Sequence, residues 1–172
     1  MSFTQLAAKF GSPYVASTAL GMGLTGYFWY GNLALKYQGV LPYSEKARTT
    51  HTQKLDAWTW MFERGKKQMG MSIIVATLAY TTAAILAPAG RLRAPLVVAA
   101  GLSASSPIWT LVLMMPTNNR LLELAEKSKA DPLVPTAEVD ALIARWKALH
   151  NARIVLGACA YFTGMAVLLL AM

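Results

Sequence analysis

The sequence predicts an all-α integral membrane protein, a bundle of four helices that cross the bilayer. Hydrophobic residues make up 55% of its 172 residues and charged residues only 14%, whereas a soluble domain carries about 25% charged residues. The charges lie between four long stretches that contain none, at 13–35, 68–87, 94–115 and 154–172. Each stretch has about the 20 apolar residues that cross a bilayer. Because lipid offers no hydrogen-bond partner to an open backbone, each must be helical.

We expect one membrane domain over residues 1–172, given this length. The first stretch, 13–35, is longer than the roughly 7–15 apolar residues of a signal peptide, so we interpret it as a span. Small residues four positions apart let helix backbones approach closely. They predict a compact bundle, and the same faces are candidates for a homo-oligomer. These pairs are Ala19 and Gly23, Gly101 and Ser105, and Ala160 and Gly164.

The connections between the predicted spans differ in length. A short turn, 88–93, joins the second and third spans, whereas long connections, 36–67 and 116–153, with short helices inside them, join the other pairs. Both long connections therefore lie on one face of the membrane and both termini on the other. The long connections hold 13 of the 16 Lys and Arg residues and all eight acids. The positive-inside rule predicts that they are cytosolic, and we expect the membrane to be an endomembrane. The opposite face holds Lys9, Arg91 and Arg93.

The net charge of +8 and the isoelectric point near 9.8 fit this topology. In a membrane protein such an excess reflects orientation and anionic headgroups, so we expect a lipid bilayer and no nucleic acid as partner. The single cysteine, Cys159, is interpreted as a small packing residue. There is no phosphate-binding glycine loop, CxxC pair or HExxH box. Two histidines are too few for an ordinary zinc site, so no metal site is predicted.

The segment 136–153 predicts an amphipathic helix that starts at a Thr136 N-cap and continues into the fourth span. Trp146, His150 and Arg153 recur at positions i, i+4 and i+7, which places an aromatic ring, an imidazole and a fixed cation on one face. An ionisable residue that faces the interior of a membrane bundle is by default a functional hypothesis. The alternative is that Arg153 snorkels to lipid phosphate and His150 bonds a backbone carbonyl.

The end of the third span supplies further candidates. Pro116 is expected to end that span, and the residues after it, 117–119, suit the cap of a new helix. The alternative is that Asn118 and Arg120 are donors at the mouth of a cavity.

Aromatic and amide residues near the same face are candidates for ligand binding. Trp58 and Phe62 share a helix face and form either an interfacial belt or flat walls for an aromatic ligand. Tyr30 and Asn32 lie near the cytosolic end of the first span, and Asn32 should face protein rather than lipid. His51 lies in a polar stretch and is interpreted as solvated.

Two short motifs resemble those of the DUF1772 family of small membrane proteins, which includes the fungal anthrone oxygenases. They are 115–118, Met-Pro-Thr-Asn, at the end of the third span, and Arg145-Trp146 followed by Leu149-His150 and Arg153 at the start of the fourth. The resemblance covers essentially the whole chain. It implies a monooxygenase of polyketide biosynthesis, in secondary metabolism, that uses O2 to convert an anthrone, a small aromatic polyketide, to an anthraquinone.

Roles for the candidate residues follow from this resemblance. His150 would remove a proton from the central CH2 group of the anthrone, and Arg153, Arg120 or Asn118 would stabilise the oxyanion. Residues that would hold the substrate are Trp146, Trp58, Phe62, Tyr30 and Asn32.

This route requires no cofactor, but a haem or metal bound through His150 would serve the same reaction, and the sequence does not identify one. The rival hypothesis is a non-catalytic carrier or scaffold module for small hydrophobic molecules. A weaker third hypothesis is a protein that binds lipid headgroups through its basic face.

Overall fold

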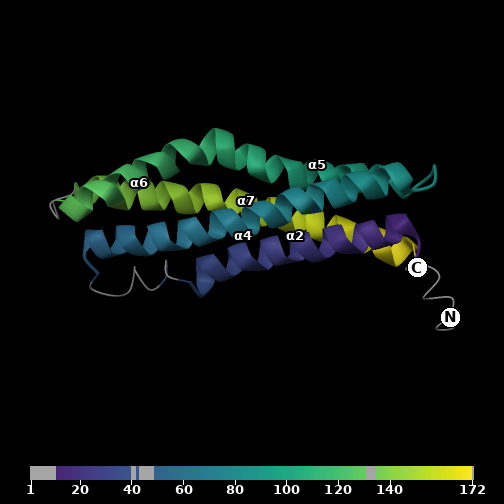
Figure 1. The fold of residues 1–172 in the computed structure, drawn as a ribbon, viewed down its shortest axis with the longest axis horizontal. Helices are drawn as coiled ribbons and strands as arrows, with labels where there is room; N and C mark the ends of the chain where they lie inside the picture. Colours follow the sequence, from purple (N-terminus) through teal and green to yellow (C-terminus); the bar gives the residue numbers. More distant parts are fainter. Residues whose placement is uncertain (1–10, 40–41, 43–48, 131–134, 172) are drawn as a thin grey trace.

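The computed structural model describes residues 11–39, 42, 49–130 and 135–171, and this part of the chain contains helices and no strand. The helices form long rods that lie side by side (Figure 1). Helix α2 packs against α4 and α7, and α5 packs against the same two helices, so the rods enclose a common core. The rods are α2 (Pro13–Tyr37), α4 (His51–Leu86), a composite of α5 (Arg93–Trp109), the π-helix η1 (Thr110–Met114) and α6 (Met115–Ala130), and α7 (Thr136–Ala171).

Three of these rods are long and apolar enough to cross a membrane, which is the property expected of a membrane protein. They are α4, α7 and the composite rod from Arg93 to Ala130. Helix α2 is 25 residues long, but glycine, threonine and tyrosine make it less apolar, and it is not among them. The first predicted span, 13–35, therefore stays a prediction, although its helix forms at the expected place.

The long connections differ from the prediction of loops that contain short helices. Helices α4 and α7 have 36 residues each. At 1.5 Å per residue each helix is about 54 Å long, whereas the hydrocarbon core of a bilayer is roughly 30 Å thick. The N-terminal halves of α4 and α7 are therefore continuous extensions of the apolar segments 68–87 and 154–171.

A capping box explains where α4 begins. The Thr50 hydroxyl accepts a hydrogen bond from the Gln53 N–H (3.3 Å), and the Gln53 side chain accepts one from the Thr50 N–H (2.9 Å). The interpretation of His51 as a residue of a polar loop is therefore wrong, because the helix begins at that residue.

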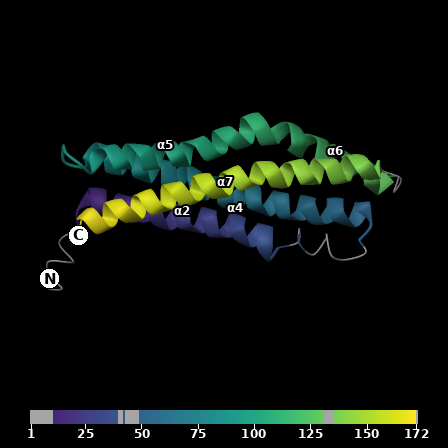
Figure 2. The same ribbon diagram turned by 180° about the vertical axis from the view of Figure 1, so that it is seen from behind.

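The prediction that Pro116 ends the third span is also wrong. Pro107 and Pro116 both lack an N–H, and between them the chain changes from α to π geometry instead of breaking. Such π segments bend a helix, and the composite rod bows away from its neighbours near its middle (Figures 1 and 2). Thr117 and Asn118 are buried inside α6, so they do not cap a new helix.

Tyr80 of α4 lies at the centre of the termini-side half of the core. Its side chain is fully buried, and its hydroxyl donates to a backbone carbonyl of α7 at 3.2 Å. A Cβ atom at Gly21 would lie 2.9 Å from the Tyr80 ring, and one at Gly164 would collide with the Tyr80 hydroxyl. The predicted close packing is therefore found at Gly164. It is not found at Gly23 or Gly101, where an added Cβ would meet nothing within 4 Å.

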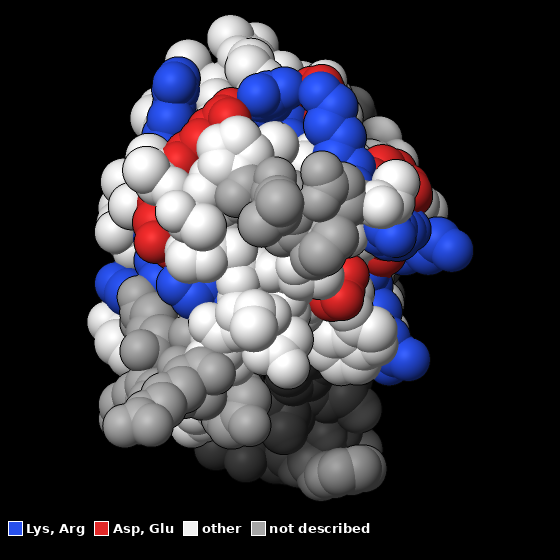
Figure 3. Space-filling view, turned by 90° about the vertical axis from the view of Figure 1, so that its left-hand side faces the viewer, with Lys and Arg blue, Asp and Glu red and all other residues white. Residues whose placement is uncertain are grey.

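Ion pairs fasten the polar extensions together at one end of the molecule. Asp140 of α7 lies 2.9 Å from Lys54 and 3.1 Å from His51 of α4, and Glu138 of α7 lies 2.6 Å from Arg120 of α6. Viewed end-on, this end carries charged side chains of both signs around its rim (Figure 3). Exposed pairs add little stability individually, but together they fix the register of the three helices.

The opposite end holds the turn between α4 and α5, together with the start of α2 and the end of α7 (Figure 1). Gly90 has φ = 148°, a conformation that disfavours other residues. Arg93 closes the turn, because its guanidinium donates to the carbonyl of Ala87 at 2.8 Å. The two long connections therefore lie at one end of the bundle and the short turn at the other.

Candidate active site

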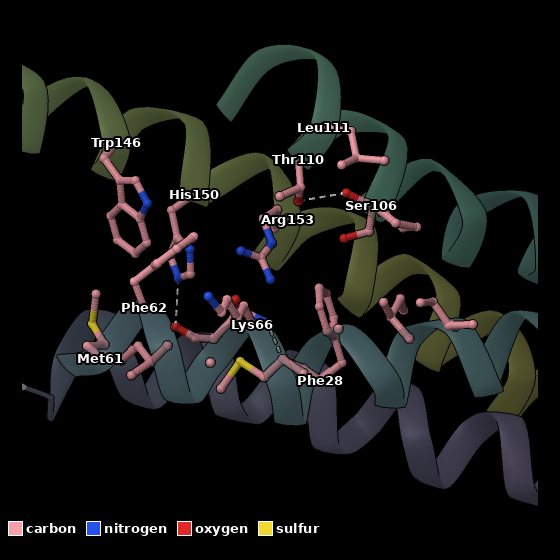
Figure 4. A pocket seen from close by; sticks show the side chains of 18 residues that line it. Phe28, Met61, Phe62, Lys66, Ser106, Thr110, Leu111, Trp146, His150 and Arg153 are labelled. Atoms are coloured by element: carbon pink, nitrogen blue, oxygen red, sulfur yellow. Dashed lines mark hydrogen bonds between the residues drawn. The ribbon is translucent and has the colours of Figure 1, made fainter. Parts of the chain in front are cut away.

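A cavity of about 240 Å³ lies among the rods where the composite rod bows outward, and we call it the central cavity (Figure 4). It is larger than the roughly 150 Å³ that accommodates benzene and smaller than the roughly 300–1,000 Å³ of sites for drug-sized ligands. It therefore suits a compact molecule of a few fused rings. Residues that line it include Phe28 and Asn32 of α2, Phe62 and Lys66 of α4, Ser106 of α5, Thr110 of η1, and Trp146, His150 and Arg153 of α7.

His150 is 2% exposed, and its surroundings fix both its tautomer and its orientation. Its Nε2 atom lies 3.2 Å from the backbone oxygen of Asn32. A carbonyl only accepts hydrogen bonds, so Nε2 carries the hydrogen and Nδ1 carries the lone pair. The imidazole also stacks on the indole of Trp146, with centroids 4.6 Å apart. Nδ1 is buried with no hydrogen-bond partner, so it is a fixed, unused acceptor.

The imidazole is neutral at pH 7. His150 precedes the apolar segment of α7. Burial, and to a smaller extent the nearby charge of Arg153, lowers the pKa of His150 to about 4. The hydrogen bond to the Asn32 carbonyl acts in the opposite direction and raises this pKa. A neutral imidazole is the form that accepts a proton. A base with this pKa is weaker than free imidazole, so any proton transfer to it requires stabilisation of the anion left behind.

Arg153 provides a positive charge beside this base. Its guanidinium lies over the ring of Phe28 at 5.3 Å and points into the cavity (Figure 4). Its Nε atom is buried without a hydrogen-bond partner, and no acid of the described ranges forms an ion pair with it. The site therefore contains a cation whose counter-charge must come from elsewhere.

Two more polar groups of the cavity wall lack partners. The Asn32 side chain donates from Nδ2 to the Phe28 carbonyl at 2.6 Å, which leaves its Oδ1 buried and unbonded. The Ser106 hydroxyl oxygen is also buried and unbonded. A few unsatisfied polar groups in an otherwise apolar cavity are typical of a ligand site.

The structure brings five of the sequence-predicted residues to the central cavity: His150, Arg153, Trp146, Phe62 and Asn32. Trp58 lies behind this wall. Its ring stacks on Phe62 at 5.0 Å with an interplanar angle of 9°, and it meets Trp146 edge-on at 6.3 Å. Trp58 therefore supports the aromatic wall without lining the cavity.

Besides Trp58, three predicted residues do not line the cavity. The guanidinium of Arg120 forms ion pairs with the carboxylates of Glu138 and Glu123, with N–O distances of 2.6 and 2.8 Å. Asn118 is buried within α6, where its amide lies 3.7 Å from the sulfur of Met115.

Tyr30, the third of these residues, is 59% exposed and packs on Trp29 with ring centroids 4.6 Å apart. Its placement has a simple geometric reason. Residues two apart on an α-helix point about 200° from one another, so Tyr30 and Asn32 cannot share a face.

Four polar or aromatic residues that were not predicted from the sequence also line the cavity: Phe28, Lys66, Ser106 and Thr110. Phe28 precedes Asn32 by four positions and Lys66 follows Phe62 by four, so helical spacing from known candidates would have found both. Ser106 is a polar residue in an apolar segment, which is itself a sign that it faces protein.

A second cavity, of about 340 Å³, is also lined by His150 and Trp146, and we call it the outer cavity. Its other lining residues are Lys36, Tyr37, Pro42, Lys147 and Asn151. The stacked ring pair therefore forms part of the wall of both cavities.

Metal ligation by protein alone has little support at this site. Within the described ranges, no group of three or more His, Cys, Asp or Glu side chains could hold a metal ion. Nδ1 of His150 is a single nitrogen donor.

Comparison with known proteins identifies one family. The model of the anthrone oxygenase family matches residues 58–163. This segment contains the cavity residues of α4, α5, η1 and α7, and leaves out those of α2. No curated protein and no solved structure matches the chain.

Proposed function

Because the chain belongs to the anthrone oxygenase family, we propose that it is a membrane-bound oxygenase that uses O2 to convert an anthrone to an anthraquinone. The observation that carries this proposal is the neutral His150, with Nδ1 unbonded, beside the unpaired Arg153 in a cavity with aromatic walls. The family match supports oxygenase chemistry, and the site residues supply a base, a cation and flat surfaces.

The reaction begins with removal of a proton from the central CH2 group of the anthrone by Nδ1 of His150. The resulting anthrolate is electron-rich and transfers one electron to O2, and the two radicals combine to form a C–O bond. The peroxide takes a proton from His150 and then loses the second C–H proton and hydroxide, which leave as water. One oxygen atom of O2 remains in the new carbonyl and the other is in the water.

Arg153 would stabilise the negative charge that develops on the substrate oxygen after deprotonation. A preorganised donor of this kind contributes about 3 kcal/mol to a transition state. This contribution matters because the lowered pKa of His150 makes it a weak base on its own. Phe62 and Trp146 would hold the flat substrate, and Trp58 would support them from behind.

We place the protein in an endomembrane as a single domain that spans it four times, with α2 as the first span. The polar extensions of α4, α6 and α7 would face the cytosol, since they carry most of the Lys and Arg residues. The site then lies at the cytosolic end of the apolar segments. The exposed glycines Gly23 and Gly101 are the candidates for contacts in a homo-oligomer.

The experiment is an assay of purified protein with an anthrone, in which substrate loss and oxygen uptake are measured together. One O2 consumed per anthrone oxidised supports the oxygenase. Binding without turnover supports the rival carrier or scaffold module. An absorption spectrum of the same sample tests for a haem held through His150, because a haem gives a Soret band.

A further inference from the structure

We propose that the central cavity binds the anionic form of an aromatic ligand, with the negative oxygen at Arg153, more tightly than the neutral form. This inference rests on the proposed function in taking the central cavity as the substrate site. It goes further in stating a preference for the anionic form that is measurable without turnover; the same preference would favour the anthrolate that His150 forms.

The first argument is the unpaired state of Arg153. Burying a charge without a partner is costly, and proteins pair such charges or bind ions with them. Arg153 has only the face of Phe28 as an interaction partner within the described part of the chain, and its Nε is buried and unbonded. An anionic ligand would supply the missing counter-charge and form the planar, two-point contact that a guanidinium favours.

The second argument is the sign of the whole cavity. Its described lining contains two cations, Arg153 and Lys66, and no Asp or Glu. Lys66 is exposed and paired with Glu63 at 2.6 Å, so it lies at the rim and its charge is partly compensated. His150 is neutral and adds no negative charge. A cleft with low-dielectric walls and one sign of charge concentrates ions of the opposite sign.

The third argument selects an aromatic anion over an aliphatic one. Phe28, Phe62 and Trp146 present rings to the cavity from three different helices, α2, α4 and α7 (Figure 4). Trp58 stacks on Phe62 and holds that ring in place. Flat, rigid walls suit a planar ligand, whereas a lipid chain needs no such surfaces.

Binding is tested with three probes in a non-ionic detergent: anthracene-9-carboxylate, the neutral anthracene-9-methanol, and decanoate as an aliphatic anion. Affinity is read from quenching of tryptophan fluorescence and checked by calorimetry. The wild-type protein should bind the aromatic carboxylate at least about tenfold more tightly than the alcohol, as expected for a charged hydrogen bond. It should also bind it more tightly than decanoate.

Two variants with the same loss of charge locate the effect. Arg153→Gln should remove the preference for the carboxylate, and Arg145→Gln should keep it, because Arg145 is an exposed residue of α7 outside both cavities. Equal affinity for carboxylate and alcohol in the wild type, or a preference that survives Arg153→Gln, overturns the proposal. Decanoate binding as tight as that of the aromatic carboxylate overturns its aromatic part.

A second pair of variants tests whether the probes occupy the central cavity. Gly70 lines the cavity, and an added Cβ there meets nothing within 4 Å. The side chain of Gly70→Leu should therefore occupy part of the central cavity and weaken the binding of both anthracene probes about equally. Gly101→Leu, at an exposed helical glycine with the same free surroundings, should leave binding unchanged. Unchanged affinity in Gly70→Leu would place the probes elsewhere and overturn the proposal.

Thermal unfolding separates a ligand-binding Arg153 from a structural one. Arg153→Met should raise the Tm of the ligand-free protein, because it removes a partly buried charge that has no counter-charge in the described part of the chain. Anthracene-9-carboxylate should raise the Tm of the wild type but not of this variant. A lower Tm in ligand-free Arg153→Met would show that Arg153 holds the fold and would overturn the proposal. Anthrone turnover is measured separately, so a working oxygenase without anion preference would refute this inference alone.

Discussion

The imidazole of His150 stacks on the indole of Trp146 with centroids 4.6 Å apart and planes inclined by 16°. Together with the hydrogen bond from Nε2 to the Asn32 carbonyl, this contact leaves His150 a single orientation and a single tautomer. The lone pair of Nδ1 is therefore positioned before any ligand binds. Preorganisation of this kind is what a base requires, since proton transfer depends first on geometry.

Replacement of His150 tests this role directly. His150→Ala should reduce anthrone oxidation about 10²–10⁴-fold, the usual effect of losing a general base. The other histidine provides the control: His51→Ala removes an exposed imidazole paired with Asp140 and should leave turnover intact. A His150→Ala protein that is well folded and retains more than about a tenth of the wild-type rate would exclude His150 as the base.

Conservative replacement of Arg153 tests the shape of the cation as well as its charge. Arg153→Lys keeps a positive charge but loses the planar, two-point donor geometry, so turnover should fall while the protein remains folded. Steady-state kinetics of the wild type and the variant measure this. Unchanged kcat and KM would mean that only the charge matters.

Arg120 offers a contrasting case, because the structure places it in ion pairs instead of at the cavity. Arg120→Gln should leave turnover per folded molecule nearly unchanged and lower the Tm, since it loosens α6 from α7.

The ion pairs among Arg120, Glu123, Lys127 and Glu138 should also make stability depend on pH. Hydrogen bonds and ion pairs with Lys127 and Arg120 lower the pKa of Glu123 from 4.5 to about 2, and Arg120 lowers the pKa of Glu138.

These lowered carboxyl pKa values set the direction of the pH effect. The stabilisation from Glu123 is fully present above pH 4.5 and is lost as the pH falls towards 2. Thermal unfolding between pH 7 and pH 2.5 should therefore show a decreasing Tm below about pH 4.5. The decrease should be smaller in Arg120→Gln. An identical decrease in both proteins would assign acid sensitivity to other groups.

The two arginines of the short turn should have no catalytic role. They lie at the end of the molecule opposite the polar extensions, and about 20 helical residues at 1.5 Å each separate them from the level of His150. Replacing Arg91 and Arg93 with Gln should preserve turnover per folded molecule. Some loss of Tm is expected, because Arg93 bonds the Ala87 carbonyl. A loss of turnover beyond about tenfold would contradict this placement, because it would mean that the site lies near the short turn.

Topology is tested by labelling single cysteines in a background in which Cys159 is replaced by Ser. A cysteine at position 145 should be reached from the cytosolic side and one at position 91 from the opposite side. The expectation rests on the 13-to-3 distribution of basic residues between the two faces. Labelling of both positions from one side would contradict the proposed arrangement.

The four apolar helical segments, and the helix face that carries Trp146, His150 and Arg153, could be predicted from the sequence. These are local properties: the length of an apolar stretch and the spacing of residues along one helix follow from the helix geometry alone. The same geometry places Tyr30 and Asn32 on opposite sides of α2, so only Asn32 faces the site.

Only the tertiary structure decided which groups meet across helices. The Asn32 carbonyl that fixes the tautomer of His150 is 118 residues away in the chain. Arg120 pairs with Glu138 and does not line the central cavity, and the π-helix between two prolines bows the composite rod beside the cavity. Such contacts depend on how each helix is rotated about its axis and packed against its neighbours, and the packing of the whole core sets that rotation.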